Sequence, residues 1–90
     1  MKYKRVYIRV IARFDPDGSI VPISFTWLDG RSYAIDKVLD MKPRPATKAG
    51  GFGNRYRVRI CGKERYLFLE APFEERDTAL RWFVEVPLAA

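Results

Sequence analysis

Apolar and polar residues alternate with a period of two along most of the chain. This is the pattern of β-strands, whose successive side chains point to opposite faces. In residues 2–14, for example, Ile8 falls on one face and Arg9 on the other. No stretch favours a helix longer than about two turns. The pattern predicts six strands, at residues 2–14, 20–27, 31–41, 54–61, 64–70 and 78–86.

Residues 54–70 form the most informative predicted hairpin. A two-residue turn at Gly62-Lys63 would place Cys61 opposite Glu64, and the pairing would run outward from there. One face of the hairpin is then apolar, and the other carries three arginines beside two aromatic rings. The predicted pairs on this second face are Arg55 with Glu70, Arg57 with Phe68, and Arg59 with Tyr66.

A second predicted hairpin turns at residues 28–30. A three-residue loop with its glycine in the left-handed region opposes Phe25 to Tyr33 and keeps apolar residues together. The same register opposes Ile23 to Ile35. A two-residue turn would instead bury an acidic side chain, so we predict the three-residue loop.

Proline and glycine mark the places where the alternation stops. Residues 42–53 hold two prolines and three glycines and predict a flexible basic loop. Pro22 cannot donate a ladder hydrogen bond, which predicts an edge, a bulge or a strand start at that position. Residues 71–77 predict a connection with one helical turn, and residues 87–90 predict a frayed tail.

The strands and turns predict one all-β domain over residues 1–86. Ninety residues can bury a hydrophobic core without disulfides or metals. A small SH3-like or OB-like barrel of about six antiparallel strands, with no long helix, fits this length best because closure removes exposed strand edges. A six-stranded sandwich stays open as the alternative architecture.

Charge is unevenly distributed along the chain. The formal net charge is +6, and residues 42–65 carry eight basic side chains against one acidic side chain. Such a segment favours a patch that attracts polyanions. Cys61 is the only cysteine, so no intrachain disulfide can form. No apolar run reaches the ~18 residues of a membrane span, and we expect a cytoplasmic protein.

The chain lacks most of the side chains that catalysis uses. It has no histidine, which excludes Ser-His-Asp and Cys-His nucleophilic sites and histidine metal sites. The glycines of residues 50–53 lead into a strand, whereas a phosphate-binding loop leads into a helix. Neighbouring acids such as Glu74 and Glu75 are expected to be solvated. We therefore expect a non-enzymatic protein without a cofactor or metal.

Arginine beside an aromatic ring on an open sheet face suits nucleic-acid binding. The guanidinium neutralises phosphates, and the ring offers a stacking plane for a base. The sequence thus predicts weak binding of nucleic acid, mainly through its phosphate backbone. The candidate residues are Arg55, Arg57, Arg59, Tyr66 and Phe68 on the hairpin, Tyr7 and Arg9 if the first strand lies alongside, and Lys42, Arg44, Lys48 and Phe52 in the basic loop.

Two other interpretations of the same residues stay open. Exposed arginine–aromatic pairs contribute ~0.5–1 kcal/mol to stability, so the face could serve the fold alone. The face, or an unpaired edge strand, could also bind an acidic or extended peptide of another protein, or a second copy of the chain. Salt separates these binding hypotheses, since phosphate contacts weaken steeply as salt rises.

Part of the second hairpin resembles a pattern found in small uncharacterised bacterial β proteins. In that pattern a tryptophan, a Gly-Arg turn, an aromatic residue and a Val-Leu pair recur on one hairpin. The matching residues here are Pro22, Phe25, Trp27, Gly30, Arg31, Tyr33, Ile35, Val38 and Leu39. Some such domains are similar to tail segments of proteins related to Y-family DNA polymerases. The resemblance implies a small β domain of unassigned function with a connection to nucleic-acid metabolism.

Overall fold

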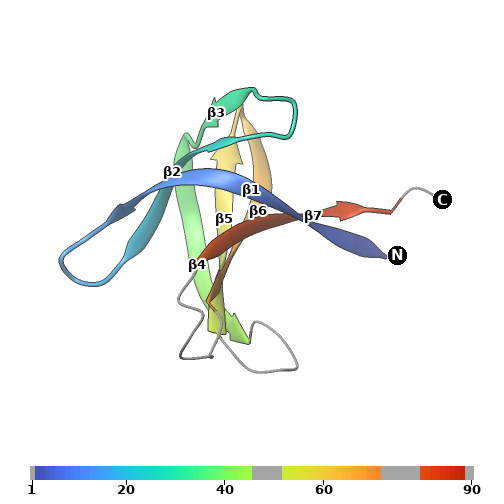
Figure 1. Cartoon of the computed structure of the whole chain (residues 1–90). Coiled ribbons are helices and arrows are strands. Elements are labelled where there is room, and N and C mark those ends of the chain that lie inside the picture. The colour runs from blue at the N-terminus through green and yellow to red at the C-terminus, as the bar shows by residue number, and fades with distance from the viewer. Residues whose placement is uncertain (1, 46–51, 72–79, 89–90) are drawn as a thin grey trace.

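The computed structural model describes residues 2–45, 52–71 and 80–88, and within these residues the protein contains strands and no helix. All the strands join one antiparallel sheet in the order β3-β2-β1-β7-β6-β5-β4 (Figure 1). The strands are β1 (Tyr3–Phe14), β2 (Ile20–Thr26), β3 (Ser32–Ala34), β4 (Lys37–Pro45), β5 (Phe52–Ile60), β6 (Lys63–Ala71) and β7 (Arg81–Pro87).

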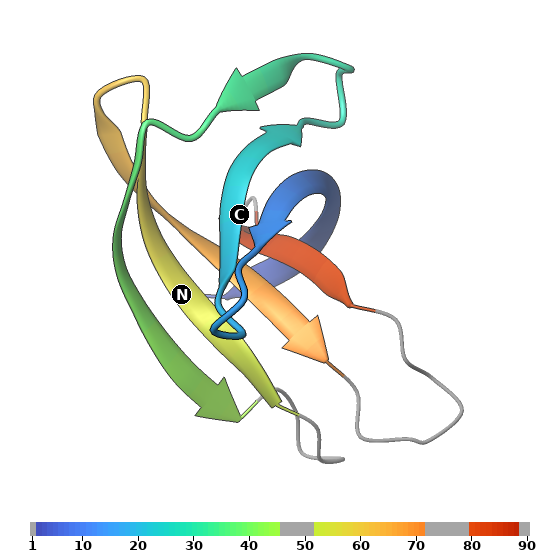
Figure 2. The same ribbon diagram turned by 90° about the vertical axis from the view of Figure 1, so that its left-hand side faces the viewer.

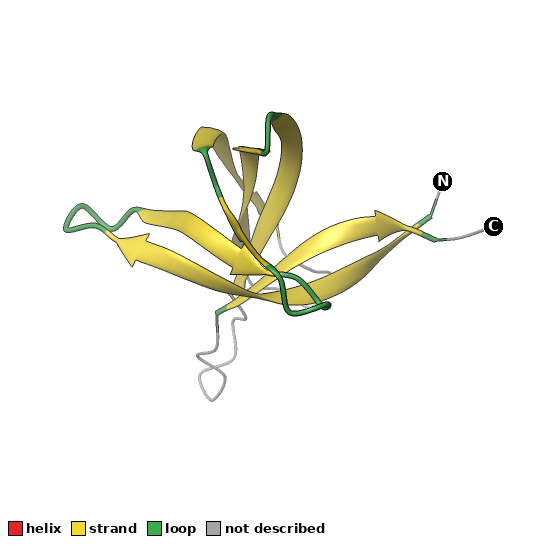
Figure 3. Ribbon diagram, turned by 90° about the horizontal axis from the view of Figure 1, so that it is seen from above, coloured by secondary structure: helices red, strands yellow, loops and turns green. Residues whose placement is uncertain are grey.

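The sheet curls into a half-barrel, because β1 and β7 run across the direction of β4, β5 and β6 (Figures 1 and 2). The first and last strands pair with each other in the middle of the sheet, with Tyr3 opposite Pro87. The start of β1 and the end of β7 therefore lie side by side at one end of the molecule (Figure 3). The predicted all-β, barrel-like fold is confirmed, with seven described strands in place of about six.

The additional strand arises from a break in the predicted strand at residues 31–41. Ile35 donates its backbone N–H to the Ile23 carbonyl on β2 at 2.9 Å. The next residue, Asp36, donates its N–H to the Arg59 carbonyl on β5 at 2.8 Å. These two residues thus bond to opposite ends of the sheet, and the chain crosses here from β3 to β4. The prediction of one continuous strand was wrong because alternation carries no information about which neighbour a strand has.

The hairpin between β2 and β3 has the predicted register. Phe25 lies opposite Tyr33, and the Gly30 N–H donates to the Trp27 carbonyl at 3.0 Å across the loop. Gly30 has a φ of 86°, in the left-handed region that the loop requires. Pro22 lies beside the register shift between β1 and β2, so the proline occupies a bulge, one of its predicted settings.

The hairpin between β5 and β6 turns one residue earlier than predicted. Ile60 lies opposite Lys63, so the turn residues are Cys61 and Gly62, with φ values of 51° and 76°. Two positive φ values are the signature of a type I′ turn, whose twist matches that of the flanking strands. Each predicted pair consequently changes by two residues. A shift by an even number leaves every side chain on its predicted face.

The predicted flexible loop at residues 42–53 was wrong at both ends. β4 continues to Pro45 and β5 begins at Phe52. β4 is an edge strand, where prolines are tolerated because no further strand needs their N–H groups. Residues 46–51 and the predicted helical turn after Ala71 lie outside the described residues. The predicted fraying also fails at Leu88, whose N–H donates to the Lys2 carbonyl at 2.9 Å.

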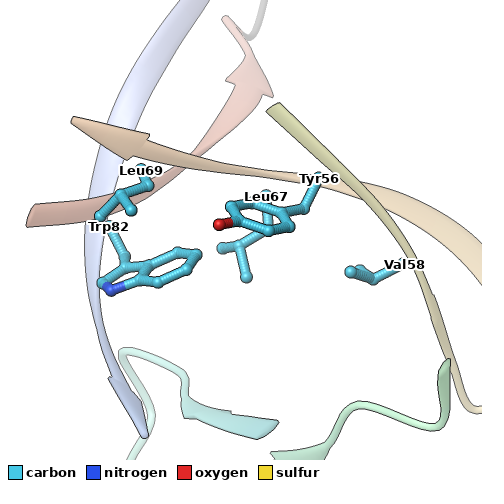
Figure 4. Close-up of a cluster of buried hydrophobic side chains, with 5 residues drawn as sticks. All are labelled: Tyr56, Val58, Leu67, Leu69 and Trp82. Carbon is cyan, nitrogen blue, oxygen red and sulfur yellow. The ribbon is translucent and has the colours of Figure 1, made fainter. Parts of the chain in front are cut away.

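The hydrophobic core lies in the interior of the curl (Figure 4). The Tyr56 ring packs at a tilt on Trp82, with 5.4 Å between ring centroids. Partly buried side chains of β1 and β2, such as Val10 and Ile20, complete the packing. The buried cluster consists of Tyr56, Val58, Leu67, Leu69 and Trp82.

Candidate nucleic-acid interface

The outer face of the β4–β5–β6 segment carries a row of basic side chains around one tyrosine. Arg57 lies directly opposite Tyr66, so the two side chains share this face. Lys42 lies opposite Arg55 on the neighbouring strand, which extends the same face onto β4. We call this surface the basic–aromatic face. It consists of Lys37 and Lys42 on β4, Arg55, Arg57 and Arg59 on β5, and Tyr66 on β6.

Tyr66 is the ring at the centre of the face, and it is 49% exposed. The Arg55 guanidinium lies over the ring, 4.8 Å from its centroid. This contact is diagonal, since the direct cross-strand partner of Arg55 is Phe68. A cation–π contact of this kind orients Arg55 and leaves about half of the tyrosine open to solvent.

Arg57 is partly neutralised by an acid on the same face. Its guanidinium lies 3.4 Å from a Glu64 carboxylate oxygen, and the two side chains are 41% and 53% exposed. Asp40 on β4 is also the cross-strand partner of Arg57. An exposed ion pair contributes ~0–1 kcal/mol and is screened by salt. Another anion can therefore replace Glu64 as the partner of Arg57.

Two pairs of basic residues lie directly opposite each other on β4 and β5. These are Lys42 with Arg55 and Lys37 with Arg59. The Lys42 ammonium reaches Asp40 only at 4.0 Å. Among the residues that the structure describes, no carboxylate lies within ion-pair distance of Arg59. Glu64 is the cross-strand partner of Arg59 on β6, and Asp40 is that of Arg57 on β4. With five cations against these two acids, the face keeps an excess of positive charge. Like charges directly opposite each other also destabilise a sheet.

Phe68 does not belong to the exposed face, which corrects the prediction that its ring is free to stack. It is 5% exposed. Its ring lies almost parallel to that of Phe83, with centroids 5.0 Å apart and an interplanar angle of 8°. Phe83 lies against Phe68 because β7 pairs with β6 at this position. The hairpin sequence alone contains no signal for this neighbour.

Tyr7 and Arg9 are also separate from the basic–aromatic face. β7 lies between β1 and β6, so the first strand does not lie alongside the hairpin as the prediction required. The Tyr7 ring is tilted on Phe83 at 5.6 Å, and Arg9 is exposed on β1 opposite Thr26. Neither residue joins the site.

Glu70 is the centre of a buried polar cluster on the outer side of β6, β7 and β1. It is 6% exposed, and its carboxylate lies 2.8 Å from the Arg5 guanidinium and 3.1 Å from that of Arg81. The Tyr7 hydroxyl donates to the same carboxylate at 3.3 Å. The predicted Arg55–Glu70 pair is therefore wrong. Glu70 thus engages both arginines, and the cluster lies outside the basic–aromatic face.

The remaining candidates come from the predicted basic loop. Arg44 lies on β4 opposite Gly53, and Phe52 begins β5. Their side chains, and the whole of Lys48, lie outside the described residues. Lys37 was missed by the sequence, because its place opposite Arg59 depends on the break at residues 35–36.

Comparisons of the chain with protein-family models, with curated proteins and with solved structures found no match. The resemblance at residues 22–39 therefore stays a prediction. Within the described ranges no helix is long and apolar enough to cross a membrane. The same ranges contain no group of three acidic, cysteine or histidine side chains arranged to hold a metal ion. The arrangement described above is suited to attracting an extended anion.

Proposed function

We propose that the basic–aromatic face binds nucleic acid through its phosphate backbone, weakly and with little sequence preference. The observation that carries this proposal is the placement of Lys42 opposite Arg55 and of Lys37 opposite Arg59. Such pairs cost stability in the free protein. A phosphate bound between the two cations removes their repulsion and adds charge-assisted hydrogen bonds.

Tyr66 supports nucleic acid as the anion. Its exposed ring lies beside Arg55 and Arg57, within the basic area. Stacking of a base on an aromatic side chain contributes ~1–3 kcal/mol and tolerates every base. Contacts of lysine and arginine to phosphate carry no sequence information. Low sequence preference follows from both kinds of contact.

Fluorescence anisotropy of labelled single-stranded and double-stranded oligonucleotides at several salt concentrations tests the proposal. Lys42→Gln and Arg59→Gln are each expected to weaken binding equally for all sequences. Each is also expected to reduce the slope of log K against log salt by about one. Arg9→Gln is the matched control, since it removes an exposed arginine outside the face.

The stacking role of the Tyr66 ring is tested by comparing the Tyr66→Ala and Tyr66→Phe variants. Loss of binding to single strands is expected for alanine only, because phenylalanine keeps the stacking plane. Absence of binding at ~50 mM salt, where a phosphate contact is strong, rejects the proposed function. Equal losses in the Arg9→Gln control would show a nonspecific effect of net charge instead of a site.

A further inference from the structure

A groove opens between β6 and β7, on the side of β6 opposite to β5, and Tyr66 of the basic–aromatic face lies at its border. The two strands pair only from Phe68 opposite Phe83 to Glu70 opposite Arg81, and their remaining lengths have no ladder with each other. Among the residues that the structure describes, β6 from Lys63 to Leu67 pairs with β5 alone. The hollow between the diverging strands has a volume of about 820 Å³.

The walls of this groove are strand edges. Residues 63–68 of β6 and residues 84–87 of β7 line it as two unbroken runs. Side chains alternate between the faces of a strand, so a face would contribute every second residue. An unbroken run therefore includes residues of both faces, as expected where a hollow lies along the edge of a strand. Unpaired strand edges present N–H and C=O groups that an added strand can bond.

Aromatic side chains from another part of the half-barrel line the same groove. Phe25 and Tyr33 stack with 5.3 Å between centroids, and Trp27 lies beside them in the lining. All three are half-buried. Val58 and Leu67 are fully buried members of the lining. The groove can thus bury apolar side chains of an occupant.

Two cations and two acids line the groove, and they lie on different sides of their strands. Glu64 and Glu85 are out of phase with the core-side Leu67 and Val84, so they lie on the outer side, where Glu64 pairs with Arg57. Lys63 and Arg65 give the inner side of the groove its charge preference. Lys63 and Arg65 lie four and two residues before Leu67 on β6, so they share the core side of the strand with it. The Arg65 guanidinium donates to the Glu64 backbone carbonyl at 2.9 Å. In the described parts of the chain, neither cation has a carboxylate within ion-pair distance. An occupant with acidic side chains would complement them.

We propose that this groove binds an extended segment of a partner protein that carries alternating apolar and acidic side chains and adds a strand to β6. The unpaired edge supplies backbone hydrogen bonds, and the cations and rings select the side chains. A second copy of the chain fits poorly. Any β6–β6 pairing that keeps both Leu67 side chains on the core side brings Lys63 and Arg65 of both copies onto one face.

The test titrates the full chain with three synthetic heptapeptides and follows backbone amide signals by NMR. The first peptide alternates valine and glutamate on one face, with threonine on the other. The second replaces glutamate by lysine. The third is the acidic peptide with alternate backbone nitrogens methylated, so that it cannot donate along one edge. We expect shifts within residues 63–67 and at the Trp27 indole. We also expect at least tenfold weaker binding of the second and third peptides.

Charge reversal in the protein provides the reciprocal test. The double variant Lys63→Glu with Arg65→Glu is expected to prefer the lysine peptide, whereas Arg9→Glu, outside both the groove and the basic–aromatic face, is expected to behave as wild type. Equal binding of the methylated peptide would overturn the proposal in favour of an apolar ligand pocket. Equal binding of the lysine peptide, or no shifts at millimolar peptide, would also overturn it. Concentration-dependent shifts at the same amides without peptide would assign the groove to a second copy. None of these outcomes depends on the oligonucleotide experiment.

Discussion

The Tyr56 hydroxyl on β5 donates a 2.6 Å hydrogen bond to the backbone carbonyl of Ile20 on β2. These strands are not neighbours, because β1, β7 and β6 lie between them in the sheet. The bond therefore crosses the interior of the half-barrel and joins its two halves. It lies in the same core as the tilted contact between Tyr56 and Trp82 (Figure 4).

Replacing Tyr56 by phenylalanine is expected to lower the free energy of unfolding by about 1–3 kcal/mol. The variant keeps the ring but leaves the Ile20 carbonyl without this donor, and an unsatisfied acceptor costs about that amount. Urea denaturation measures the change. Tyr33→Phe is the matched control, since no hydrogen bond of the Tyr33 hydroxyl occurs among the described residues. Equal effects in both variants would contradict the role of the bond.

Alkaline pH is expected to weaken the fold through the same hydroxyl. Burial raises the pKa of Tyr56 above its ordinary value of 10.0, and a hydrogen bond from Asn54 opposes this only in part. Above pH 10 the unfolded chain loses the tyrosine proton while the folded chain keeps it. The free energy of unfolding is thus unaffected below pH 10 and falls as pH rises through the raised pKa. The fall from pH 9 to pH 11 should be smaller in Tyr56→Phe than in wild type.

Removing the charge of the buried Glu70 carboxylate is expected to lower folding stability more than removing the charge of the exposed Glu64 carboxylate. Glu70→Gln removes the partner of Arg5 and Arg81. Because both arginines keep some solvent contact, we expect a loss of about 1–3 kcal/mol, below that of a fully buried pair. Glu64→Gln breaks only the exposed pair with Arg57 and should change stability by less than about 0.5 kcal/mol. Thermal denaturation compares the two, and similar losses would contradict this ranking.

The β5–β6 turn contains one residue that fits its backbone poorly and one that fits it well. Cys61 has a φ of 51°, which costs a non-glycine residue free energy. Cys61→Asn is expected to raise stability by about 0.5–1 kcal/mol, since Asn-Gly is the preferred type I′ pair. Gly62→Ala is expected to lower it by about 1–2 kcal/mol through φ alone, because no atom lies within 4 Å of the added Cβ. Cys61→Ala controls for loss of the thiol and should not stabilise.

The opposed cations predict a conflict between stability and binding. Lys37→Thr relieves the repulsion with Arg59 and is expected to raise the free energy of unfolding by about 0.2–1 kcal/mol at low salt. The same variant should bind oligonucleotides more weakly. The stability gain should fade at high salt, where charges are screened. A variant that loses stability at low salt would show that Lys37 serves the fold.

Side-chain direction on the β5–β6 hairpin could be predicted from the sequence even though the turn was misplaced. Moving the turn from Gly62-Lys63 to Cys61-Gly62 changes each partner by two residues, and a period of two is insensitive to that change. Arg57 and Tyr66 therefore share a face in either register. The loop before Arg31 was equally predictable, because one register alone kept Phe25 and Tyr33 together.

Local alternation thus determined most of the strand residues, the face that each side chain takes and the turn at residues 28–30, whereas the β5–β6 turn and the extents of β4 and β5 differ from the prediction. The neighbours of each strand outside its own hairpin could be learned only from the folded chain. Phe68 is buried because β7 places Phe83 against it. Glu70 pairs with Arg5, which lies near the other end of the sequence. The groove between β6 and β7 exists because those strands diverge after three paired residues. Pairing between distant segments depends on how the whole sheet curls and packs, and no period in a single segment encodes that geometry.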